Sequence, residues 1–86
     1  AICYLEALKE YIAIHTETEK ILVYKRMKEV AAQLPPQFVR IHNSYIVNLR
    51  HIKNIESHLV MVKGESLPVS NGYRALFQER IQAKLL

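Results

Sequence analysis

The sequence of 86 residues contains no aspartate, a single cysteine and only two glycines. The missing aspartate excludes aspartyl phosphorylation, a Ser-His-Asp triad and most magnesium sites. Two glycines, Gly64 and Gly72, cannot form a glycine-rich phosphate loop. Cys3 has no partner for an internal disulfide, so a reducing compartment, the cytoplasm, is the expected location. We therefore expect no catalytic residues and no enzymatic activity.

Long apolar runs and metal-ligand spacings are missing as well. The longest apolar runs, such as Ile21–Tyr24, are far shorter than the roughly 20 residues of a transmembrane helix, so no membrane partner is expected. The four histidines form no pair at i, i+4 and have no cysteine cluster beside them. Because zinc sites need such closely spaced ligands, we expect no metal ion and no other cofactor.

The charge and hydrophobicity of the chain are those of a small basic domain. Twelve lysines and arginines against eight glutamates give a net charge of +4 and a pI near 9.4, which favours a polyanionic partner. Hydrophobic residues make up 50% of the chain, enough for one core, so residues 1–86 should form a single domain. The chain has no initiator methionine and opens on a strand-like segment, and we expect it to be a piece of a longer protein.

Short apolar or alternating segments separated by polar turns predict a mainly antiparallel β domain. Residues 7–10 should connect the first two strands, residues 11–25 should form one hairpin, and a second hairpin should turn at Gly64. Pro68 favours an edge position for the last strand, because proline has no N–H to donate. The expected strands are Ile2–Leu5, Tyr11–Ile14, Ile21–Tyr24, Phe38–Ile41, Ile52–Glu56, Leu59–Lys63 and Glu65–Val69.

Two helices complete the predicted fold, a short internal one and a C-terminal one. The first should carry an apolar face from Met27 to Leu34 and end before Pro35-Pro36. The second should begin at Tyr73, with Ser70 or Asn71 as its N-cap. Its apolar face comprises Tyr73, Leu76, Phe77, Ile81 and Leu85. No partner helix precedes it, so a helix-turn-helix is disfavoured, and strand ends and loops would have to contact any DNA.

Polar side chains gather where the strand from Phe38 ends. Val39 and Ile41 should face the core, which leaves Arg40 and His42 together on the opposite face. Arginine can bind a phosphate or a guanine edge, asparagine matches adenine, and Ser44 can donate to phosphate. The alternatives are local: His42 could bond a neighbouring carbonyl, and Asn43 and Ser44 could serve only a turn or a helix cap. Spacing alone does not decide between them.

The whole sequence resembles the LytTR DNA-binding domain family, the effector domain of bacterial response regulators. Its characteristic motif, F-x-R-x-H-x-S-[YF]-[IVL]-V-N, is matched in register by Phe38, Arg40, His42, Ser44, Tyr45, Ile46, Val47 and Asn48. Further matches are Tyr4, Glu6, Ala7 and Tyr11 in the opening hairpin, LPPQF before the motif, Ile52 and Ile55 after it, and Pro68, Val69 and Ser70 before the last helix.

The resemblance implies an elongated antiparallel β fold that binds double-stranded DNA, at directly repeated sites, by placing loops in successive grooves. It also implies an N-terminal receiver domain in the same chain, and it is compatible with a dimer on DNA. The implied contact residues lie in three loops: Lys9 and Tyr11; Arg40, His42, Asn43 and Ser44; and Ser70, Asn71 and Arg74. Asn43 and Asn71 stand where many relatives carry a basic residue, which should alter the base preference.

A second interpretation from another functional class is also compatible with the composition. The basic β domain could be a protein-interaction module that docks a receiver domain or a partner protein. The salt dependence of affinity distinguishes the two hypotheses. Affinity that rests on phosphate contacts falls steeply with ionic strength, whereas the affinity of a mainly apolar protein interface does not.

Overall fold

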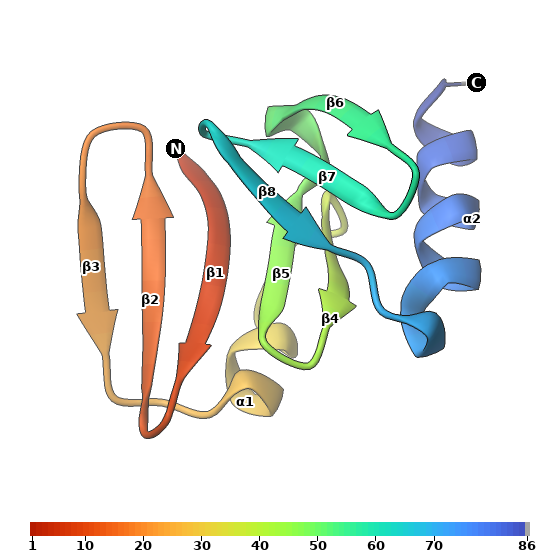
Figure 1. The fold of residues 1–86 in the computed structure, drawn as a ribbon. Helices are drawn as coiled ribbons and strands as arrows, with labels where there is room; N and C mark the ends of the chain where they lie inside the picture. The colour runs from red at the N-terminus through yellow and green to blue at the C-terminus, as the bar shows by residue number, and fades with distance from the viewer. Residues whose placement is uncertain (86) are drawn as a thin grey trace.

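The computed structural model describes the backbone of residues 1–85 and the side chains of residues 1–82. Within these residues the strands form two antiparallel sheets, one ordered β3-β2-β1-β5-β4 and the other β6-β7-β8 (Figure 1). The strands are β1 (Ile2–Leu8), β2 (Tyr11–Thr16), β3 (Lys20–Val23), β4 (Phe38–His42), β5 (Tyr45–Asn48), β6 (Ile52–Glu56), β7 (Leu59–Val62) and β8 (Glu65–Pro68). The helices are α1 (Met27–Ala31) and α2 (Arg74–Leu85), with short 3-10 turns at Leu49–His51 and Asn71–Tyr73. The predicted mainly β fold with a short internal helix and a C-terminal helix is confirmed.

The middle of the larger sheet, β1 and β5, is buried on both faces, because these strands alternate apolar side chains between two hydrophobic clusters. Leu5 and Ile46 face the cluster that contains Met27 of α1. Their neighbours Tyr4 and Val47 face the opposite cluster, which is completed by the smaller sheet and α2. Each fully buried valine, leucine or isoleucine stabilises the fold by about 1.5–3 kcal/mol. The two clusters therefore determine which side chains of β1 and β5 face each layer.

The first strand and the first helix differ in length from the prediction. β1 continues to Leu8, which pairs with Tyr11, so the connection is only Lys9-Glu10 and not residues 7–10. α1 ends at Ala31, and Leu34 packs on the α1-side cluster from the turns that follow. These turns form because the N–H groups of residues 33 and 34 bond carbonyls three residues back and the proline after Leu34 disfavours helix there.

The strand β5 was not predicted from the periodicity. It follows β4 after only Asn43-Ser44 and lies in the sheet between β1 and β4. Ile46, Val47 and Asn48 are all buried, so the short run lacks the alternation that marks a half-exposed strand. The missing strand matters for the site, because β5 is the element that joins β4 to β1.

The second hairpin turns at Gly64 as predicted, but Lys63 belongs to the turn and β8 ends at Pro68. Lys63 and Gly64 form its two-residue turn with φ values of 52° and 76°, the left-handed conformation that such tight hairpins require. Pro68 lies on β8, an edge strand of the smaller sheet. The described residues include no helix that is both long and apolar enough to span a membrane.

Candidate nucleic-acid interface

The three loops that carry the candidate residues lie at one edge of the molecule (Figure 1). β1 and β4 both run antiparallel to β5, so they run in the same direction and their C-terminal ends share this edge. The Ala7 N–H donates to the Ser44 carbonyl at 2.8 Å, and the Ser70 N–H donates to the Ile41 carbonyl at 2.9 Å. Backbone hydrogen bonds therefore attach the end of β1, next to the first loop, to the second loop, and the third loop to the end of β4.

The first loop is the β1–β2 turn. Lys9 takes a left-handed backbone conformation, with φ of 27°, and its side chain is exposed. Tyr11 opens β2 with 46% of its surface exposed and contacts Tyr24 edge to face, with ring centroids 5.4 Å apart. An exposed lysine beside an exposed aromatic pair suits a phosphate backbone and the sugars next to it.

The second loop is the β4–β5 turn, and its side chains first of all hold the turn itself. Arg40 donates from Nε to the His42 carbonyl at 3.3 Å and from Nη2 to the Asn43 carbonyl at 2.8 Å. The Ser44 N–H donates to His42 Nδ1 at 3.0 Å. A backbone N–H can only donate, so Nδ1 is the acceptor and the neutral ring carries its proton on Nε2. The predicted outward position of Arg40 and His42 is confirmed by the burial of Val39 and Ile41.

Asn43 joins the second loop to the third. The Tyr73 hydroxyl donates to Asn43 Oδ1 at 3.0 Å, which orients the amide and leaves both Nδ2 hydrogens to donate elsewhere. The Arg40 guanidinium lies 5.8 Å from the centre of the Tyr73 ring, a cation–π distance. Sequence reasoning assigned Tyr73 only to the apolar face of the last helix. No local signal could have found this role, because the contact spans 30 positions.

The third loop leads from β8 into α2. Ser70 precedes the 3-10 turn, but its side chain forms no capping hydrogen bond, and the Tyr73 N–H bonds the Ser70 carbonyl instead, at 2.9 Å. The predicted side-chain N-cap is therefore wrong, because a 3-10 turn intervenes before α2. Asn71 is exposed, and no hydrogen bond joins its side chain to another described residue. Arg74 is half-buried and donates from Nε to the Val69 carbonyl at 3.2 Å.

Other polar groups of the sheet lie outside this edge. His15 stacks on Tyr4, with ring centroids 4.1 Å apart, and its Nε2 lies 3.0 Å from Glu6 Oε1. Burial, and then the nearby carboxylates of Glu6 and Glu65, raise the pKa of Tyr4 to about 12. Cys3 is a core residue, 3% exposed, with its Sγ 3.7 Å from Nδ1 of His51.

Known proteins share both the sequence pattern and the fold. Residues 1–82 match the family model described as the LytTr DNA-binding domain. Sensory transduction proteins LytT from Bacillus cereus and Bacillus anthracis are each 28% identical over 84% of this chain, which spans 32% of their length. The solved structure of the LytTr DNA-binding domain of a protein named as a methyl-accepting/DNA response regulator, from Bacillus cereus, aligns with a TM-score of 0.84. That alignment has 32% identity and covers 93% of this chain and 80% of the other. The chain belongs to the LytTr DNA-binding domain family.

Proposed function

We propose that this domain binds double-stranded DNA in a sequence-specific manner and is the effector domain of a two-component transcriptional regulator. The observation that carries the proposal is the Tyr73–Asn43 hydrogen bond at the edge where the three loops meet. It holds an exposed amide in one orientation on a turn that two bonds from Arg40 already fix. A side chain held in advance loses less conformational entropy when it binds a base edge.

The proposed division of labour follows the chemistry of each loop. Asn43 contacts a base edge, since a carboxamide offers both a donor and an acceptor to adenine in the major groove. His42, through Nε2–H, and Ser44 contact acceptors beside it, while Arg40 keeps the turn in shape. Asn71 and Ser70 make the contacts of the third loop in a neighbouring groove. Lys9, Tyr11 and Arg74 bind the sugar–phosphate backbone, which positions the domain without selecting sequence.

The proposal extends to the protein of which this domain is a part. The chain spans about a third of the length of the curated relatives, which are named sensory transduction proteins. We infer that residues 1–86 form one DNA-binding domain of a longer cytoplasmic response regulator with an N-terminal receiver domain. Directly repeated sites would then be occupied by two copies of the regulator, as a dimer on DNA.

The test is a selection from random duplex DNA followed by affinity measurements on the selected and a random duplex. About four to six neutralised phosphates should give a log–log salt slope of about −4 to −5. Asn43→Ala should cost about 1–3 kcal/mol on the selected duplex and almost nothing on the random one. A flat salt response with no selected sequence would refute DNA binding and favour the protein-docking alternative.

A further inference from the structure

The segment between β3 and α1 carries cations along the same edge as the three loops. The chain leaves β3 at Val23 and enters α1 at Met27, and the connection crosses this edge next to the β1–β2 turn (Figure 1). It contributes Lys25 and Arg26, and Lys28 follows in α1. Together with Lys9 these residues form what we call the basic rim. All of its side chains are exposed.

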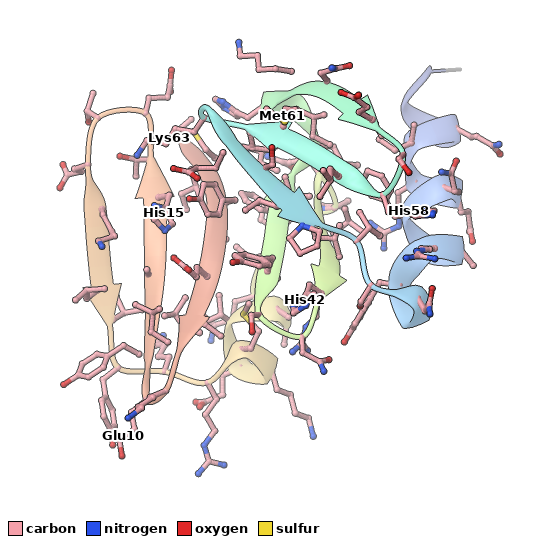
Figure 2. All side chains as sticks on the ribbon, in the orientation of Figure 1. Glu10, His15, His42, His58, Met61 and Lys63 are labelled. Atoms are coloured by element: carbon pink, nitrogen blue, oxygen red, sulfur yellow. The ribbon has the colours of Figure 1, made fainter. Side chains whose placement is uncertain are left out.

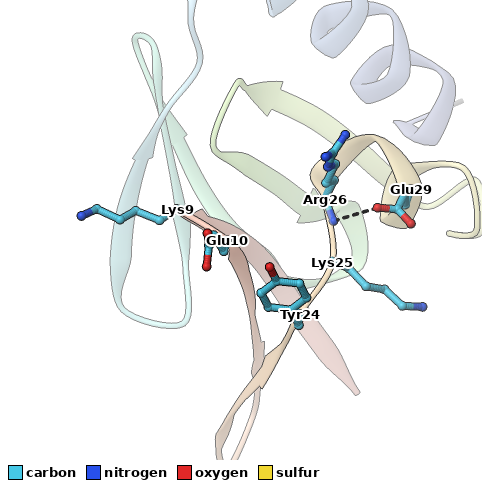
Figure 3. Close-up of a pocket in the computed structure, with 6 residues that line it drawn as sticks. All are labelled: Lys9, Glu10, Tyr24, Lys25, Arg26 and Glu29. Atoms are coloured by element: carbon cyan, nitrogen blue, oxygen red, sulfur yellow. Dashed lines mark hydrogen bonds between the residues drawn. The ribbon is translucent and has the colours of Figure 1, made fainter.

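The basic rim borders a hollow beside the first loop. The hollow has a volume of about 450 Å³ and is lined by Lys9, Glu10, Tyr24, Lys25, Arg26 and Glu29 (Figure 3). None of the rim cations forms an ion pair with another described residue. Glu29 accepts a hydrogen bond from the Arg26 backbone N–H at 3.3 Å, so this carboxylate serves the start of α1. The four rim cations therefore outnumber the two carboxylates of the hollow, Glu10 and Glu29. Their charge is available to bind an anion from outside the domain.

The arginines of the other two loops are less available for phosphate, because they already donate hydrogen bonds within the domain. Arg40 uses Nε and Nη2 on the carbonyls of its own turn. Arg74 uses Nε on the Val69 carbonyl and is half-buried. If the affinity for DNA is largely electrostatic, most of that charge has to come from the side of the β1–β2 turn. Among the cations on that side, the sequence analysis named only Lys9 as a DNA contact.

The arrangement of the rim indicates a chain of phosphates and not one small anion. Lys9 and Lys25 extend in opposite directions, and Arg26 extends in a third (Figure 3). A single phosphate would need these groups to converge on one point, whereas a DNA strand presents a phosphate at every 3.4 Å of helix axis.

We propose that the basic rim is a fourth DNA contact. It binds the sugar–phosphate backbone beside the groove that the β1–β2 turn faces. The proposal rests on the proposed function and adds to it the source of the sequence-independent affinity. The rim raises the affinity for every duplex alike and leaves the choice of sequence to Asn43 and Asn71.

The test compares two double variants of equal net charge. Lys25→Gln/Arg26→Gln removes two rim cations. Lys20→Gln/Lys63→Gln removes two exposed cations away from this edge, one at the start of β3 and one in the β7–β8 turn. Figure 2 shows Lys63 on the side of the molecule opposite Glu10 and His42. The rim variant should flatten the log–log salt slope by about 2, because each phosphate contact contributes about 0.9. Between 50 and 200 mM salt it should therefore lose about tenfold less affinity than the wild type. The control variant should keep the wild-type slope, and the selected sequence should stay the same for both.

Two outcomes overturn the rim: a slope equal to that of the wild type, or an equal flattening by the control pair, which would mean a general effect of charge. A wild-type domain that binds no duplex refutes the proposed function itself. Wild-type binding that Asn43→Ala weakens and the rim variant leaves unchanged refutes the rim alone. The substitutions keep the Arg26 backbone bonds that start α1. If the double variant nevertheless unfolds, Lys25→Gln alone should flatten the slope by about 1, and an unchanged slope would reject the rim.

Discussion

Tyr73→Phe isolates the contact that orients Asn43. The substitution removes the hydroxyl that donates to Asn43 Oδ1 at 3.0 Å and keeps the ring, which packs against the core cluster and beneath Arg40. The lost hydrogen bond is exposed, so the stability cost should lie near the lower end of the usual 0.5–1.5 kcal/mol. In a domain of this size about 0.5 kcal/mol lowers the melting temperature by about 2–4 °C.

The substitution should weaken binding to the selected duplex more than binding to a random duplex. Without the Tyr73 hydroxyl, the Asn43 side chain has to be immobilised when DNA binds. This costs about 0.5–1.5 kcal/mol for a side chain with several rotamers. Affinity for the selected duplex should therefore fall by about 2- to 13-fold. Affinity for a random duplex should stay within error, because phosphate contacts do not involve this amide.

A double-mutant cycle decides whether the two residues act together. Tyr73→Phe should have no further effect in an Asn43→Ala background, because the group that it orients is gone. Fluorescence anisotropy on both duplexes, at a temperature where all variants are folded, gives the four affinities. An equal loss on selected and random DNA, or a full loss in the Asn43→Ala background, would refute the orienting role of Tyr73.

Three further predictions follow from the same contacts. Asn71→Ala and Ser70→Ala should both leave the melting temperature nearly unchanged, because Ser70 makes no capping bond and the Asn71 side chain bonds no other described residue. Asn71→Ala should also weaken duplex binding, whereas a lowered melting temperature would mean that these side chains cap the helix after all. Arg40→Ala removes two bonds to turn carbonyls, so it should destabilise the domain by about 1–3 kcal/mol and weaken the selected duplex more than the random one, as binding and chemical unfolding would show. The raised pKa of Tyr4, about 12 against 10.0, means that the folded state keeps the proton longer than the unfolded state. Stability should therefore fall as the pH rises from about 10 to 12, and Tyr4→Phe, measured in the same pH series, should show a smaller decline.

Local patterns predicted most of the elements and the faces of β4, but neither β5 nor the contacts between loops. The alternation of Val39 and Ile41 with Arg40 and His42 is a property of neighbouring residues, so it was visible in the sequence. The family resemblance implied the three contact loops, and they remain a prediction. The bond between Asn43 and Tyr73 depends on β4 and the start of α2 meeting in space. The use of Arg40 to hold its own turn, and the position of β5 in the middle of the sheet, likewise depend on tertiary packing.

The pairing of β1 with β5 has a consequence for the order in which the domain folds. The remaining ladders join strands that are consecutive along the chain, whereas Tyr4 pairs with Val47 across more than half of the described sequence. Closing so long a loop costs more entropy than forming a hairpin, so we expect this ladder to form late. Until it forms, the first loop is not attached to the other two. We therefore expect a refolding chain to acquire tight duplex binding only in the last kinetic phase, and binding that precedes amide protection of Tyr4 would contradict this order.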